Sequence, residues 1–147
     1  MWIDLICRLR QDCKFGVPAG EAEIAAAEKA LGIDFPSELR ALLAESNGVI
    51  SGPHGAILVW PVERIEQDNL FFWTNSDFRD RYMPTDHLLF FGDSGVGDQF
   101  AFAVVNGRVQ RSDVFEWDHE TDSRTRVATS LAHFFEKWFA GTPWRGR

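Results

Sequence analysis

The chain has 147 residues, of which 45% are hydrophobic and 25% are charged, and its formal net charge is −7. This length is typical of one domain with a sizeable core, and no apolar run approaches the roughly 18 residues that a membrane span needs. Residues 61–122 hold thirteen acidic and five basic residues, whereas residues 123–147 hold one acidic and five basic residues. Because such an acidic middle region repels phosphate and attracts basic partners, we expect no direct binding to nucleic acid.

The first segment predicts a helix, because apolar residues recur at helical spacing at Trp2, Leu5, Ile6, Leu9 and Cys13. It contains no uninterrupted apolar stretch of the signal-peptide type. Cys7 would lie roughly 240° around this helix from Cys13, too far for a disulfide. We therefore expect two free thiols and a reduced, cytoplasmic environment.

Residues 15–20 contain two glycines and a proline and predict a connection. A second helix is predicted from Glu21, where negative charge complements the helix dipole, to Gly32, which suits a helix end. A third helix is predicted to begin at Pro36, because the fixed φ of proline fits the first helical position. Its end is predicted at residues 47–48, an Asn-Gly pair.

The next segment contains weaker signals. Residues 48–55 predict a loop, residues 56–60 a short strand, and residues 62–67 a short helix. Residues 70–83 mix aromatic and charged side chains without a clear period, so we expect an irregular loop with at most one helical turn.

A hairpin is predicted over residues 88–105, LLFFGDSGVGDQFAFAVV. Leu88–Phe91 and Phe100–Val105 carry no charge and are aromatic or β-branched, as in buried strands. The loop between them has three glycines, which permit the positive φ of a tight reversal. It carries Asp93 and Asp98 at the end of a rigid sheet, a common place for functional residues.

The C-terminal third continues this pattern. Residues 106–107, Asn-Gly, predict a two-residue turn, followed by a strand over residues 109–117 with a bulge near Asp113. The remaining elements are expected to be an acidic turn at 118–123, a strand at 124–127, a helix capped by Ser130, and a loose tail at 141–147. Helices first, strands clustered in the middle and a final helix predict an α+β domain with an antiparallel sheet.

Residues 92–95, Gly-Asp-Ser-Gly, also occur around the nucleophile of trypsin-like serine proteases. That mechanism needs a histidine base and a buried carboxylate for Ser94, and none of the four histidines has the matching context. The chain is also short for two β-barrels, so we prefer the hairpin interpretation. A hydrolase that uses Asp93, Asp98, Glu116 or His119 is kept as an alternative.

Three segments in this order resemble the SUKH superfamily. They are residues 28–36 leading to Leu39 and Asn47-Gly48, residues 91–98 leading to 100–102, and residues 114–120 followed by 127–131 and by Phe134, Phe135 and Trp138. Together they extend over about residues 20–140. Members of this superfamily include bacterial immunity proteins and a fungal regulator of cell-wall synthesis.

The resemblance implies a single domain over residues 1–147, with a twisted antiparallel sheet of about four to six strands packed against N-terminal helices and a C-terminal helix. It also implies a binding protein, because many relatives are thought to neutralise a toxin, often a nuclease. The family has no shared catalytic residues to carry over, and we expect no cofactor. We therefore expect a cytoplasmic immunity protein that occludes a basic toxin domain through an acidic surface. The alternative is a non-enzymatic regulatory or scaffold interaction module.

The candidate partner-binding residues are Asp93, Asp98, Glu116, Asp118, Glu120, Asp122, Trp73 and Asp77. Asp93 and Asp98 have an alternative role in turn formation, since aspartate accepts hydrogen bonds from nearby backbone amides. Trp73 is either an interface anchor or a side chain folded over the sheet. We expect no metal site, because His119 is the only local histidine and no second ligand pair accompanies it.

Overall fold

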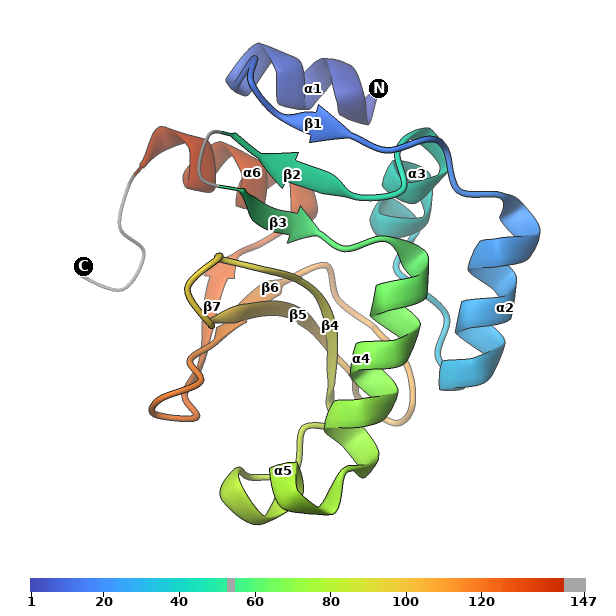
Figure 1. The fold of residues 1–147 in the computed structure, drawn as a ribbon, viewed down its shortest axis with the longest axis vertical. Coiled ribbons are helices and arrows are strands. Elements are labelled where there is room, and N and C mark those ends of the chain that lie inside the picture. The colour runs from blue at the N-terminus through green and yellow to red at the C-terminus, as the bar shows by residue number, and fades with distance from the viewer. Residues whose placement is uncertain (53–54, 142–147) are drawn as a thin grey trace.

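The computed structural model describes residues 1–52 and 55–141 (Figure 1). The helices are α1 (Trp2–Leu9), α2 (Glu21–Leu31), α3 (Ser37–Glu45), α4 (Val62–Thr74), α5 (Ser76–Arg81) and α6 (Leu131–Ala140). The strands are β1 (Lys14–Phe15), β2 (Val49–Ser51), β3 (Ala56–Val59), β4 (Leu88–Asp93), β5 (Gln99–Ala103), β6 (Val114–Trp117) and β7 (Arg124–Ala128). Among the described residues, none of the helices combines the length and apolarity that crossing a bilayer requires.

All strand pairs are antiparallel, which confirms the predicted α+β class. The strands form two sheets, one of order β1-β2-β3 and one of order β4-β5-β6-β7. Figure 1 shows α4 running alongside β4, with α6 behind the strands and α5 below them. The predicted tail, residues 141–147, lies outside the described residues except for Gly141, which ends α6 with φ 70°.

The three-stranded sheet contains two strands that the sequence did not predict. Phe15 was expected in a connection and residues 49–51 in a loop, but they pair as Lys14↔Ile50 and Phe15↔Val49. Strands of two and three residues are too short to show alternation, and a distant partner stabilises them. The first helix also ends earlier than expected: Arg10 is extended with φ −156°, so Cys13 is not on the helix that carries Cys7.

Residues 70–83 were predicted as an irregular loop, and this prediction is wrong. Helix α4 continues to Thr74, and α5 follows directly, with the side chain of Asn75 accepting a hydrogen bond from the Phe78 amide. The aromatic side chains explain the helices: Phe72 packs on Phe90 at 5.1 Å, and Phe78 packs on Trp117 at 5.8 Å between ring centroids. Tertiary packing therefore supplies the stability that the local pattern does not show.

The predicted strand over residues 109–117 is wrong in its first half, because β6 begins only at Val114. The predicted turn at residues 106–107 is confirmed. Both Asn106 and Gly107 have positive φ, 53° and 74°, as a tight hairpin turn of this kind requires. A bridge between Val105 and Arg108 closes the turn.

The four-stranded sheet is packed on both faces. On one face, Phe91 and Phe100 contact Phe134 of α6 at centroid distances of 5.8 and 4.7 Å. On the other face, the ring of Trp117 contacts Tyr82 at 4.9 Å. The final helix begins as predicted, with the Ser130 side chain accepting from the amide of the third helical residue.

The outer edge of β4 is closed by side chains and by β3. Asn69 of α4 is fully buried; its Nδ2 donates to the Phe90 carbonyl at 2.8 Å, and its Oδ1 accepts from the Phe90 amide at 2.8 Å. Nearby, the Trp60 amide donates to the Phe91 carbonyl at 2.7 Å. One amide side chain thus substitutes for a neighbouring strand at an edge that would otherwise be open.

We predict that Asn69→Leu lowers the free energy of unfolding by about 2–4 kcal/mol, because the Phe90 amide and carbonyl then remain buried without partners. The control is Gln67→Ala on the exposed side of the same helix, which should change stability by less than about 0.5 kcal/mol. Urea denaturation followed by circular dichroism measures both. Equal effects of the two variants would show that the edge contact is not important.

Candidate functional site

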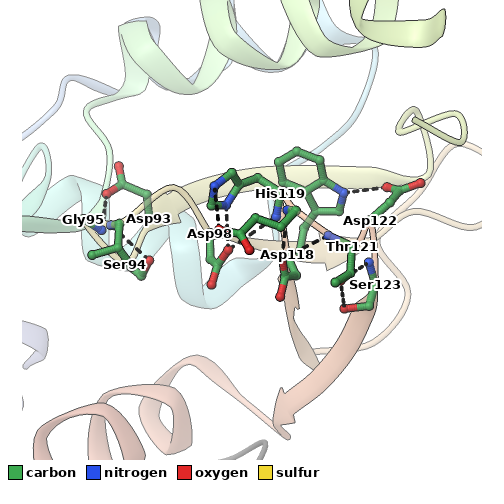
Figure 2. A network of polar contacts seen from close by, with 12 residues as sticks. Asp93, Ser94, Gly95, Asp98, Asp118, His119, Thr121, Asp122 and Ser123 are labelled. Carbon is green, nitrogen blue, oxygen red and sulfur yellow. Dashed lines mark hydrogen bonds and ion pairs between the residues drawn. The ribbon is translucent and has the colours of Figure 1, made fainter. Parts of the chain in front are cut away.

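The loop between β4 and β5 is fixed at its start by Asp93. Its Oδ2 accepts a hydrogen bond from Nε1 of Trp60 at 2.7 Å. Its Oδ1 accepts from the Gly95 amide at 2.8 Å (Figure 2). The guanidinium of Arg64 lies over the Trp60 ring at 4.3 Å and within 3.5 Å of Asp93 Oδ2. Asp93 therefore anchors the loop to the core, as its predicted alternative role in turn formation requires.

The end of β4 requires glycine at position 92, the first glycine of the loop. A Cβ on Gly92 would collide with the carbonyl oxygen of Leu58 in β3. Only glycine lets the two backbones approach this closely. The loop therefore starts where the two sheets touch.

The end of the loop is held by Asp98 and His119. The Asp98 carboxylate is buried, and its Oδ1 lies 2.9 Å from Nδ1 of His119 and 3.3 Å from the His119 amide nitrogen (Figure 2). Gly97 has φ 105°, and a Cβ there would lie 2.5 Å from Cε1 of the imidazole. The missing side chain of Gly97 thus makes room for the imidazole ring.

The backbone of His119 also contacts the residue that follows α5, because the Tyr82 hydroxyl donates to the His119 carbonyl at 3.0 Å. The pKa of His119 is raised above its ordinary value, chiefly by the hydrogen bond to Asp98, which outweighs the opposing effect of burial. Three segments that are distant in sequence therefore meet at this residue.

The turn between β6 and β7, residues 118–123, has its own hydrogen bonds. Asp118 Oδ1 accepts from the amides of Glu120 and Thr121 at 2.9 and 3.2 Å. The side chain of Glu120 is 79% exposed, and its carboxylate lies 3.9 Å from Nε2 of His119. Glu120 is therefore the acidic group that this turn presents most openly to solvent.

Asp122 closes the turn and connects it to the segment after α5. It has φ 62°; its Oδ1 accepts from Trp117 Nε1 and from Arg124 at 2.8 Å each, and its Oδ2 accepts from the Met83 amide at 2.9 Å. Burial alone would raise the pKa of Asp122, but the hydrogen bonds from Trp117, Arg124 and Met83 lower it below its ordinary value. The carboxylate is thus a structural acceptor for three segments.

The remaining predicted residues lie apart from this cluster. Glu116 is fully buried and pairs with Phe100 in the sheet, which places it on the face that α6 covers. Trp73 is half-buried and donates from Nε1 to the Leu88 carbonyl at 3.0 Å, so it folds over the sheet edge. Asp77 is exposed in the first turn of α5.

Two exposed apolar residues that belong to or contact these segments were not predicted from the sequence. Val96, between the glycines of the β4–β5 loop, is 70% exposed, and Met83, whose amide binds Asp122, is 67% exposed. The position of Val96 between two glycines of a tight loop could have indicated that its side chain is exposed. Nothing in the local sequence indicated that Met83 would be held next to the turn.

Asp98, Asp118 and His119 place potential ligand atoms within 4.8 Å of one another, a proximity that the sequence did not predict. Asp98 Oδ1 already accepts from His119, and Asp118 Oδ1 already accepts from two amides. This pattern of donors on carboxylate oxygens is typical of a structural turn. The Ser94 hydroxyl oxygen, in turn, lies 3.4 Å from the Val96 amide that donates to it.

A comparison with protein-family models identifies the family of the chain. The SUKH_6 model, described as SMI1-KNR4 cell-wall, matches residues 21–135. The chain belongs to this SUKH family. A search of the curated proteins found no match to the chain. The matched range contains the β4–β5 loop and the 118–123 turn, so the polar residues from Asp93 to Asp122 described above lie within the SUKH domain.

We predict that Gly97→Ala lowers the free energy of unfolding by about 2–3 kcal/mol, since it adds both backbone strain and a clash with the imidazole. Gly107→Ala is the matched control: Gly107 also has positive φ, but nothing lies within 4 Å of its added Cβ, and about 1 kcal/mol is expected. The chemical shift of the His119 ring protons should change only in Gly97→Ala. Equal unfolding free energies and unchanged ring shifts would contradict the packing of His119 on Gly97.

The lowered pKa of Asp122 leads us to predict that stability decreases as the pH falls. A carboxylate with a lowered folded-state pKa contributes stability above its unfolded pKa and loses it as the pH falls through the folded pKa. Asp122→Asn should therefore cost about 1–2 kcal/mol at neutral pH, and the difference from wild type should shrink as the pH falls. The exposed Asp34→Asn control should keep the wild-type slope when unfolding is measured by urea denaturation at each pH.

Proposed function

We propose that this SUKH protein is a cytoplasmic immunity-type binding protein that neutralises a toxin by occluding it. Membership of the family over residues 21–135 is the observation that carries the proposal. The resemblance noted from the sequence implies toxin neutralisation for many relatives. A stable complex of this kind would bury about 1,600 Å² of surface in total.

The excess of acidic residues in the middle of the chain supports the proposal of a basic partner. Residues 61–122 carry eight more acidic than basic residues. Within this region, Glu120 and Asp77 project into solvent, where charges raise association rates more than they raise affinity. Val96 is exposed next to Gly97, on which His119 packs, and Met83 is exposed where its amide donates to Asp122. Both side chains are available for the apolar contacts that a protein interface requires.

Binding rather than catalysis is the activity we propose. Asp93 is hydrogen-bonded to the indole of Trp60, Glu116 is fully buried, and His119 is paired with Asp98. These environments supply no evident base for Ser94, whose hydroxyl lies against the Val96 amide. They support structural roles for the residues of the hydrolase alternative.

Expression of the protein encoded next to this gene, with and without this chain, tests the proposal. We expect the neighbouring product to inhibit growth alone, this chain to restore growth, and the two to elute as one stoichiometric complex in size-exclusion chromatography. Association measured by stopped flow should slow as salt is added, because salt screens exposed charges. A complex with a product that is harmless alone would favour the scaffold alternative, and the absence of a complex would reject the proposal.

Two charge reversals locate the contact. Glu120→Lys should reduce the association rate constant on the order of tenfold at low ionic strength, because it places a cation in the acidic turn. Asp34→Lys changes the net charge equally, but it lies between α2 and α3, away from the turn. Equal effects of the two variants would indicate attraction by net charge alone and would exclude docking at the turn.

A further inference from the structure

His119 lies where the β4–β5 loop, the 118–123 turn and the residue after α5 meet. Its imidazole Nδ1 contacts Asp98 at 2.9 Å, its ring packs on Gly97, and its carbonyl accepts from the Tyr82 hydroxyl at 3.0 Å. Asp98 is itself attached to the loop, since its carbonyl accepts from the Ser94 amide at 3.0 Å. The β4–β5 loop therefore contacts the 118–123 turn through this histidine–carboxylate pair (Figure 2), next to the strand pairing of Gln99 with Trp117.

We propose that the contact between His119 and Asp98 is a pH-dependent latch, which holds the β4–β5 loop against the 118–123 turn while the imidazole is protonated and weakens when the proton is lost. The neutral imidazole still donates from Nδ1, so the loop stays folded but is held less firmly. A charge-assisted hydrogen bond is roughly twice as strong as a neutral one. The inference concerns the isolated chain and does not depend on the proposed toxin partner.

The charges around the ring favour the protonated form. Asp98 faces it from the β4–β5 loop, and Asp118 and Glu120 face it from its own turn. Tyr82, which directly follows α5, contacts the carbonyl of His119 through its hydroxyl. Three carboxylates therefore act on one imidazole, and Asp98 is in hydrogen-bond contact with its Nδ1.

The direction of the effect follows from linkage. A histidine whose folded pKa is raised contributes stability that is fully present below its unfolded pKa and is lost as the pH rises through its folded pKa. The latch is therefore tight on the acid side of neutrality and loosens on the alkaline side. Each unit by which the pKa is raised corresponds to about a tenfold change in the equilibrium between closed and open latch.

Two measurements on the purified chain test the latch. The first is the pKa of His119 from its ring-proton chemical shifts. The second is the protection factor of the His119 amide in hydrogen exchange, corrected for the intrinsic rate at each pH. We expect a pKa above that of an ordinary histidine and a protection factor that falls as the pH rises through it. The Val105 amide, which donates to Arg108 in a separate turn, should show no such change.

Matched variants separate the latch from general electrostatics. Asp98→Asn and Glu120→Gln each remove one negative charge near the ring. Asp98→Asn should bring the pKa of His119 most of the way back to its ordinary value, because it removes the largest of the three contributions, and should abolish the pH dependence of protection. Glu120→Gln should have a smaller effect, because this exposed carboxylate lies 3.9 Å from Nε2. Equal shifts in the two variants would overturn the proposal.

A third variant covers the case in which Asp98→Asn does not fold. His119→Gln cannot titrate in this range, so the protection factor of the Ser94 amide, which binds the Asp98 carbonyl, should become independent of pH. If the Ser94 amide keeps its wild-type pH profile in this variant, the latch does not exist. An ordinary pKa for His119 in the wild-type chain would have the same consequence.

Discussion

The position of the candidate site depends on how the outer edge of β4 is satisfied. An edge strand presents unpaired amides and carbonyls, which another strand would normally bind. Here the carboxamide of Asn69 binds both polar groups of Phe90, and the backbone of Trp60 binds the next carbonyl. Because these contacts end the four-stranded sheet at β4, the chain divides into two sheets and α4 takes the place of a further strand.

This arrangement fixes the start of the acidic loop. Gly92 brings β4 against the carbonyl of Leu58, and Asp93 then accepts from the indole of Trp60, which belongs to the same β3 segment. The other end of the loop is attached to the turn after β6 by Asp98 and His119. The loop is thus attached to a different part of the core at each end, and the side chains between these ends are left for solvent or for a partner.

Local signals predicted much of this fold. The hairpin after Leu88, the left-handed end of α2 at Gly32 and the Ser130 cap each depend on neighbouring residues, and the structure has all three. The strands β1 and β2 and the helix α5 were not predicted, because distant partners stabilise them. The contact between Asp98 and His119 spans 21 positions, so no local pattern could reveal that an acidic loop and an acidic turn share one hydrogen bond.

Some carboxylates of this region hold the fold and others face solvent, and this difference determines which positions can change in sequence. Asp93, Asp98 and Asp122 hold backbone and indole donors, so their replacement disturbs the architecture. Glu120 and Val96 project outward from segments whose geometry those aspartates maintain. Replacements at these outward positions leave the folding contacts intact, so under the proposed binding role one scaffold can acquire new binding specificities through a few surface changes.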